Sequence, residues 1–283
     1  MRGTWPFVIP ALIAYGFVVL WPSLQGSVFA FTDWNGLSFS YEFVGFENFL
    51  ELTQDPKAMG AVGRTLLIAI TVTVVQTLIG LLLALGVNSN IKSRNILRVI
   101  FFAPVVITPV AVGFLWKNLY STRGAINSVL DVFGIDFVSW LGDLNIAIWS
   151  ICIVVIWQYA GVTMVIILAN LQGISPEVIE ASHVDGAGPF RRFWSIVRPE
   201  LAPAFTIVLM LSLIGGLKLF DQVFILTGGG PAGATETLST LIYSNAFQYG
   251  EFAYSAAIAL VLTLLVAILS GAQYTALRRQ SRA

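Results

Sequence analysis

The chain has 283 residues, of which 57% are hydrophobic and only 11% are charged, and its formal net charge is zero. A soluble domain of average composition carries about 25% charged residues, so this sequence excludes a water-soluble globular protein and indicates a membrane protein. The chain has one cysteine and one histidine, which leaves no internal disulfide and no His/Cys metal cluster.

Six apolar segments along the chain are long enough to cross a membrane, because about 20 residues at a rise of 1.5 Å span the hydrocarbon. The predicted spans are residues 7–30, 65–87, 99–119, 145–170, 203–227 and 254–276. Residues 99–116, 144–176 and 252–277 contain no Asp, Glu, Lys or Arg at all. We therefore predict an all-α membrane protein with six transmembrane helices, organised as one domain over residues 1–283. The apolar part of the first span is too long for a cleavable signal peptide.

The basic residues predict the orientation of these spans. The N-terminus, the second and fourth connections and the C-terminal tail together hold ten Lys and Arg residues, and the rest of the chain holds five. Since cytoplasmic connections carry the excess of Lys and Arg, both termini are expected in the cytoplasm.

The fourth connection, residues 171–200, is unusually polar and patterned. Ser175 suits the position before a helix and Pro176 its first turn, so a short helix is predicted from Pro176 to about Val184. Gly186 tolerates the left-handed conformation that ends helices.

Pro189 can open a second helix that Pro199 closes. This helix carries its apolar residues on one stripe, at Phe190, Phe193, Trp194 and Val197. An interfacial helix with its arginines toward lipid headgroups would explain the second helix alone. The first helix is acidic, which suits a basic groove on a partner protein better than an anionic membrane surface.

The same connection resembles the EAA loop of ABC-importer permeases, whose pattern is E-A-A, three residues, G, nine residues, I, one residue, L-P. Here the chain reads Glu180-Ala181-Ser182, then Gly186, then Ile196, and ends at Arg198-Pro199 with matching spacing. It departs from the pattern at Ser182 and Arg198. The stretch "FDQVFILTGGGPAGATETLSTLIYSNAF", residues 220–247, is similar to the fifth helix and following loop of sugar permeases of the maltose and glycerol-phosphate type.

This resemblance implies a type I ABC importer permease fold with a cytoplasmic coupling helix in the cytoplasmic (inner) membrane of a bacterium or archaeon. The implied partners are a second homologous permease, two ATPase subunits, a solute-binding protein, the lipid bilayer and a sugar, and no nucleic acid. The chain would not be an enzyme and would carry no cofactor, since ATP and Mg²⁺ would bind the ATPase subunits. The residues implied in ATPase coupling are Glu180, Ala181, Ser182, Asp185, Gly186 and Ala187.

Sugar sites combine aromatic faces with hydrogen-bonding groups. The stretch "WQYAG" resembles the part of the maltose permease that lines the sugar site, which implies roles for Trp157, Gln158 and Tyr159. Three consecutive residues spread over about 200° of a helix, so they cannot all face one cavity. The same comparison adds Ser212, and Lys218 and Asp221 are further candidates because ionisable residues within spans usually face the protein interior. Each of these could instead be a packing residue or, for Lys218 and Asp221, an ion pair.

The expected function is import of a di- or oligosaccharide, with a glycerol-phosphate-type or other polyol solute as the alternative. An ion-coupled secondary transporter would need ionisable residues near the membrane midplane, where the charge-free segments have none. A membrane scaffold would have no use for the coupling loop, and a membrane enzyme would need paired carboxylates or a metal set that the sequence does not offer.

Overall fold

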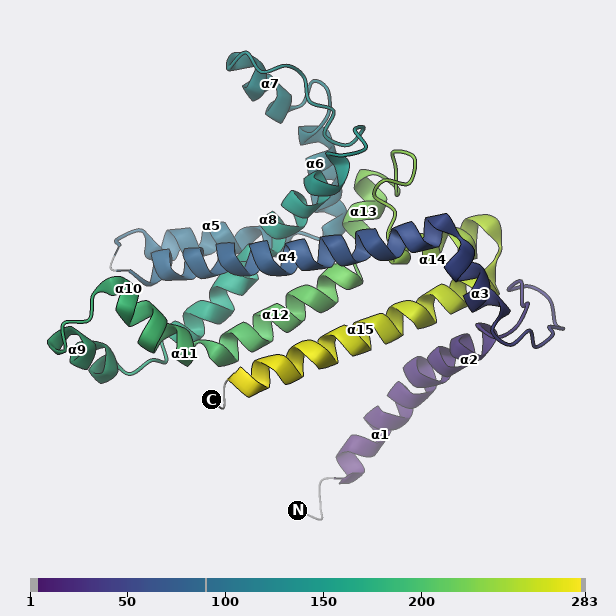
Figure 1. The fold of residues 1–283 in the computed structure, drawn as a ribbon, viewed down its shortest axis with the longest axis horizontal. Coiled ribbons are helices and arrows are strands. Elements are labelled where there is room, and N and C mark those ends of the chain that lie inside the picture. Colours follow the sequence, from purple (N-terminus) through teal and green to yellow (C-terminus); the bar gives the residue numbers. More distant parts are fainter. Residues whose placement is uncertain (1–4, 90, 281–283) are drawn as a thin grey trace. The chain divides into compact units, whose positions relative to one another are not determined.

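The computed structural model describes residues 5–89 and 91–280, which form helices without a β-sheet (Figure 1). The described residues fall into two compact units. The larger unit comprises residues 62–237 and 265 onward, and the smaller unit comprises the chain up to residue 61 together with residues 238–264.

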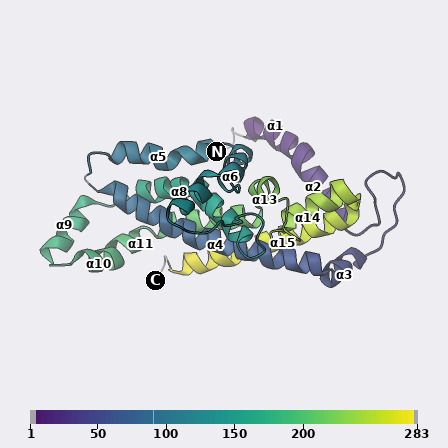
Figure 2. The ribbon, with the colours of Figure 1, turned by 90° about the horizontal axis from the view of Figure 1, so that it is seen from above.

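The larger unit holds the helices that build the candidate site. Its helices are α4 (Pro56–Asn88, which begins in the smaller unit), α5 (Arg94–Val106), α6 (Pro109–Leu119), α7 (Ala125–Val132), α8 (Ala147–Leu171), α9 (Pro176–Val184), α10 (Pro189–Arg192), α11 (Arg198–Glu200), α12 (Ala202–Leu217), α13 (Asp221–Leu226) and the later part of α15 (Phe252–Gln280). A π-helical turn, η2 (Phe193–Val197), joins α10 to α11. Figure 1 and Figure 2 both show α9 and α10 together at one end of this unit.

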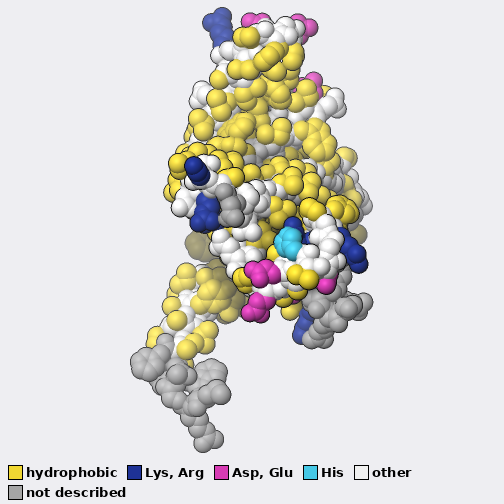
Figure 3. Space-filling view, turned by 90° about the vertical axis from the view of Figure 1, so that its left-hand side faces the viewer, with side chains coloured by type: hydrophobic (Ala, Val, Ile, Leu, Met, Phe, Trp, Pro, Cys, Tyr) yellow, Lys and Arg dark blue, Asp and Glu magenta, His cyan; other side chains and the backbone are white. Residues whose placement is uncertain are grey.

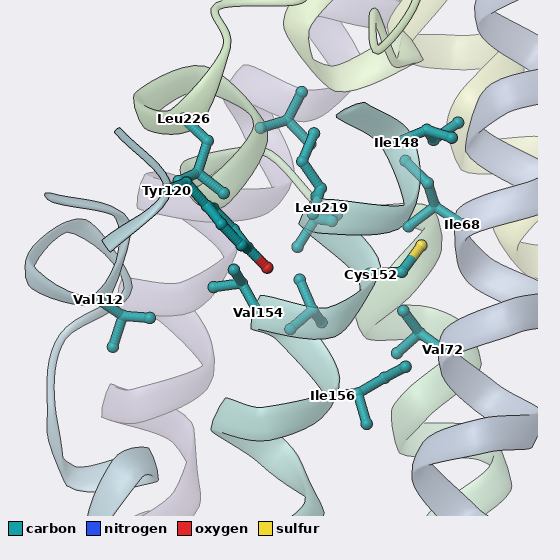
Figure 4. Packing of buried hydrophobic residues seen from close by; sticks show 13 residues of the cluster. Ile68, Val72, Val112, Tyr120, Ile148, Cys152, Val154, Ile156, Leu219 and Leu226 are labelled. Carbon is teal, nitrogen blue, oxygen red and sulfur yellow. The ribbon is translucent and has the colours of Figure 1, made fainter. Parts of the chain in front are cut away.

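The core of the larger unit surrounds α8, most of whose residues are buried. In Figure 4, apolar side chains from α4, α6, α8 and the segment around α13 point toward one another. Tyr120, which directly follows α6, donates its hydroxyl to the backbone oxygen of Ser150 on α8 at 3.2 Å. Because α8 is apolar on every side, it can pack against helices all round.

Four of the six predicted spans are confirmed as long, continuous helical stretches, at 8–29, 56–88, 147–171 and 252–278. The third predicted span, residues 99–119, is helical but not straight, because α5 and α6 meet at a bend of 100°. Ile107 and Thr108 are extended, with ψ angles of 134° and 145°. Thr108 precedes Pro109, whose ring disfavours the helical conformation of the residue before it.

The fifth predicted span, residues 203–227, is also not one helix. α12 ends at Leu217, and α13 begins only at Asp221. Gly215 and Gly216 weaken the end of α12, since glycine is a poor helix former, and Asp221 favours a new helix start. Before α12, the helical segment 189–200 meets it at a bend of 70°.

The smaller unit consists of α1 (Trp5–Tyr15), η1 (Gly16–Leu20), α2 (Trp21–Phe29), α3 (Glu47–Gln54), α14 (Leu238–Ser244), η3 (Asn245–Tyr249) and the first part of α15 (Phe252–Gln280). The segment between α2 and α3 is ordered by aromatic packing and by one buried amide. Phe29 and Trp34 stack with their ring centroids 4.1 Å apart. Asn48 donates to the backbone oxygens of Ala30 and Thr32, each at 2.9 Å.

Candidate functional site

The first helix of the fourth connection, residues 171–200, has the bounds that its sequence predicts. α9 runs from Pro176 to Val184 and ends at Gly186, whose φ of +69° is left-handed. The amide of Gly186 donates to the oxygen of His183 at 3.1 Å, and the amide of Ala187 donates to the oxygen of Ser182 at 2.9 Å. This pair of bonds is a Schellman motif, which satisfies carbonyls at the helix end and fixes the direction of the chain after it.

The six residues implied in ATPase coupling lie on α9 and this turn. Five are exposed or partly exposed, namely Glu180, Ala181, Asp185, Gly186 and Ala187. Ser182 is buried and donates its hydroxyl to the oxygen of Ile179 at 2.6 Å, so it stabilises the loop from inside. Figure 3 shows acidic, basic and histidine side chains close together at this end of the molecule.

Three local details differ from the sequence interpretation. Ser175 occupies the position before α9, but its hydroxyl makes no capping hydrogen bond. Pro199 does not close the second helix, which continues to Glu200. A π-helical turn, Phe193–Val197, interrupts this second helix before Arg198. The guanidinium of Arg198 stacks over the ring of Trp194, 5.1 Å from its centroid.

A cavity of about 430 Å³ opens among α4, α8, α12 and the break that follows α12. Its size is that of a small-molecule site. The side chains around it are mainly apolar, with polar groups from each of these elements. The polar lining residues are Gln76, Tyr159, Thr163, Ser212, Lys218, Asp221 and Gln222.

One wall of this cavity is a buried polar cluster contributed by three helices. Gln76 on α4 donates its side-chain amide to the hydroxyl of Thr163 on α8 at 2.9 Å and to that of Ser212 on α12 at 3.0 Å. All three side chains are less than 10% exposed. The hydroxyls retain lone pairs and the glutamine retains its carbonyl oxygen, so the cluster can bind further hydroxyl groups.

The structure brings four of the six predicted pathway residues to the cavity and leaves two out of its lining. Tyr159, Ser212, Lys218 and Asp221 line it. Trp157 does not, and its ring packs edge-on against Trp116 with centroids 5.4 Å apart. Gln158 is 1% exposed and bonds to other protein groups.

Sequence reasoning missed Gln76, Thr163 and Gln222. A signal existed for Thr163, which lies four residues after Tyr159 and so on the same face of α8. Gln76 was also visible as a polar residue within an apolar span, a class that usually faces the protein interior. The described residues contain no cluster of three or more His, Cys, Asp or Glu side chains that could bind a metal ion.

Comparison with known proteins identifies a family and several sugar-transport relatives. Residues 76–282 match the family model "Binding-protein-dependent transport system inner membrane component". The chain is 35% identical over 268 residues to the "Multiple sugar-binding transport system permease protein MsmF" of Streptococcus mutans, which covers 94% of this chain and 92% of that protein. It is also 35% identical over 267 residues to the "Probable starch degradation products transport system permease protein AmyD" of Thermoanaerobacterium thermosulfurigenes, covering 94% and 90%.

Solved structures agree with the fold. A chain of a bacterial ABC transporter involved in import of the acidic polysaccharide alginate superposes with a TM-score of 0.86 at 22% identity, over 97% of this chain and 94% of that one. The arrangement of helices is therefore the type I ABC importer permease fold, and the protein spans the membrane several times. Fold and sequence match agree, and the chain belongs to the family of binding-protein-dependent transport system inner membrane components.

Proposed function

We propose that this chain forms half of the translocation pathway of an ATP-driven importer for a di- or oligosaccharide. The observation that carries the proposal is the polar wall formed by Gln76, Thr163 and Ser212 in a cavity that also contains Tyr159. Sugars offer hydroxyls to such a wall and an apolar ring face to an aromatic side chain. The printed names of the relatives, multiple sugars and starch degradation products, support the same solute class.

The chain supplies the pathway and the energy comes from partner subunits. A second permease would complete the cavity, an extracytoplasmic binding protein would deliver the sugar, and two ATPase subunits would bind ATP and Mg²⁺. The exposed acidic helix α9, closed by its glycine turn, would fit a groove on an ATPase subunit. A short helix with fixed ends can transmit movement of that groove because it does not bend. Residues 171–200 would thus be a coupling loop within a single permease domain.

The charge distribution supports one orientation of the chain in the membrane. The loop that carries α9 belongs with the termini and the second connection on the basic side of the chain, which is the cytoplasmic side. The sugar would enter from the opposite side of the cytoplasmic membrane.

Uptake measurements test the solute class. The complete transporter in proteoliposomes would be assayed with radiolabelled maltose, trehalose, lactose and raffinose. Tyr159→Ala and Gln76→Leu should each lower the uptake of the transported sugar about ten- to hundredfold, because a lost stacking contact or hydrogen bond costs about 1–3 kcal/mol and about 1.4 kcal/mol is tenfold. Trp149→Ala removes an exposed aromatic side chain from the same helix and should leave uptake within twofold.

Two results would contradict the proposal. If Tyr159→Ala and Gln76→Leu lose uptake only in proportion to the protein lost from the membrane, these residues are packing residues. If neither variant loses any uptake, the solute contacts lie on the partner permease. Trp157→Ala separates the two α8 candidates, since its effect should be smaller than that of Tyr159→Ala.

A glycerol-phosphate-type solute is the second candidate, and one observation favours it. Lys218 lines the cavity and could bind a phosphate, although Asp221 lines it as well. Uptake of sn-glycerol 3-phosphate by the same proteoliposomes, with none of the four sugars transported, would select this solute. Lys218→Met should then abolish that uptake.

A further inference from the structure

Two helix breaks of the larger unit are joined by one buried glutamine of α8. The first break, Ile107–Thr108, separates α5 from α6, and the second, residues 218–220, separates α12 from α13. Gln158 donates its side-chain amide to the backbone oxygen of Ile107 at 3.1 Å. Its side-chain oxygen accepts a hydrogen bond from the amide of Gln222, the second residue of α13, at 2.8 Å.

The first of these bonds satisfies a carbonyl that the break leaves without its helical donor. In a continuous helix the oxygen of Ile107 would accept from the amide of Ala111. Here the amide of Ala111 instead donates to the side chain of Thr108 at 3.4 Å. The amide of Gln158, a side chain that is 1% exposed, supplies this oxygen with a donor in place of the missing helical one.

The same bond fixes which way the amide of Gln158 points. Its NH₂ group faces the Ile107 oxygen, so its own oxygen faces Gln222 and accepts from the NH₂ group of that side chain. Gln158 and Gln222 are 1% and 2% exposed, so water has little access to either side chain. Both breaks are thereby held to one residue of α8.

The two helices that follow the breaks are packed as a pair. A Cβ atom at Gly113 of α6 would lie 2.7 Å from the side chain of Ile225 of α13, a separation that leaves no room between the helices. Lys117 of α6 donates to the backbone oxygen of Ile225 at 3.2 Å. A movement at either break therefore moves both α6 and α13.

We infer that Gln158 is a positioning residue for transport, which holds the α6–α13 pair in place beside the cavity and does not contact the solute. Gln158 does not line the cavity, whereas the second break and Gln222 do, through residues 218–222. Without the two hydrogen bonds of Gln158, α6 and α13 can shift together. Residues 218–222, which form part of the cavity wall, then shift with them. The inference rests on the proposed role of this cavity as the translocation pathway.

Labelling of a cavity cysteine tests this without any solute. Gly215 lines the cavity and a Cβ there meets nothing within 4 Å, so Gly215→Cys in a Cys152→Ser background gives a reporter thiol. The complete transporter in proteoliposomes would be treated from the extracytoplasmic side with an impermeant maleimide, without nucleotide. Gln158→Met keeps the side-chain length and removes both bonds, and it should raise the labelling rate at least fivefold. The matched control is Gln25→Met, which removes an exposed glutamine from α2 and should not change the rate.

Uptake kinetics and a second variant complete the test. With the sugars named above, Gln158→Met should lower the maximal uptake rate about tenfold and leave the half-saturating concentration within twofold. Gln222→Met should act in the same direction, and the double variant should be no worse than Gln158→Met alone, because the two side chains act as one unit.

The outcomes separate this inference from the proposed function. A raised half-saturating concentration in Gln158→Met would mean that Gln158 contacts the solute, which overturns the positioning role and keeps the cavity. Unchanged labelling overturns the positioning role whatever the uptake shows. If none of the sugars is transported, the proposed solute class fails, and the labelling result still decides the role of Gln158.

Discussion

Gly161 of α8 faces the backbone of α5 at a contact where no side chain fits. A Cβ atom at this position would overlap the backbone oxygen of Phe101 and lie 2.9 Å from the Cα atom of Phe102. Backbone atoms cannot rotate away as a side chain can, so the two helices can approach this closely only with glycine here. Small residues serve the same purpose at helix contacts throughout membrane proteins.

Replacement of this glycine should destabilise the larger unit. Gly161→Ala forces α5 and α8 apart, and overpacking of this kind costs about 1–3 kcal/mol. We expect the melting temperature of the detergent-solubilised protein to fall by about 3–10 °C. Gly86→Ala is the matched control, since a Cβ at that position of α4 meets nothing within 4 Å. A Gly161→Ala protein that melts at the wild-type temperature would show that α5 and α8 do not need glycine at this contact.

The sequence at its two ends determines where helix α9 begins and stops. Pro176 fixes the first turn, and the Schellman motif at Gly186 fixes the last. Glu177 lies in the first turn, where the helix dipole favours an acidic side chain, and Glu180 follows one turn later on the exposed surface. The element is thus a short helix with an acidic exposed surface and a defined residue at each end.

Changes to this helix should uncouple ATP hydrolysis from transport. Glu180→Lys reverses an exposed charge, and Gly186→Pro cannot adopt the φ of +69° that the turn requires. Both variants should insert into the membrane at wild-type levels and lose transport, measured as sugar uptake. ATP hydrolysis by the assembled transporter should lose its stimulation by the binding protein.

The matched control for charge is Glu42→Lys, the same reversal at an exposed residue between α2 and α3. It should keep both uptake and stimulated hydrolysis. Wild-type uptake in the Glu180→Lys and Gly186→Pro variants would remove the coupling role of α9.

The net charge of zero is the sum of two opposite charges along the chain. With the predicted spans, the side that holds the termini would carry ten basic and four acidic residues, and the other side five basic and eleven acidic residues. The basic excess sets orientation because positively charged segments are retained in the cytoplasm during insertion.

Cysteine labelling measures this orientation directly. In a Cys152→Ser background, a cysteine at the exposed position Ser93, just before α5, should react with an impermeant thiol reagent only from the cytoplasmic side. A cysteine at Ser40, which is exposed between α2 and α3, should react only from outside. Cys152 itself is buried in α8, so its replacement removes background without touching the surface. The reverse pattern would place α9 outside the cell and exclude its contact with an ATPase.

Much of this protein follows from the sequence alone, because the signals concerned are local. Length and apolarity predict four of the spans, since the hydrocarbon thickness sets the number of residues required. The bounds of α9 follow from Pro176 and from glycine's access to a left-handed φ. Thr108-Pro109 was a readable sign of the break between α5 and α6.

The tertiary structure alone decided which side chains share the cavity. α8 is apolar on all sides, so periodicity cannot tell whether Trp157 or Tyr159 faces inward, and only its packing against α4 and α12 selects Tyr159. Gln76 and Ser212 are 136 positions apart in the chain, and their contact depends on how three helices cross. The same holds for Gln158. The sequence suggests a solute contact, whereas in the structure its side chain bonds to groups at two helix breaks. A hydrogen bond to a distant carbonyl leaves no trace in the local sequence.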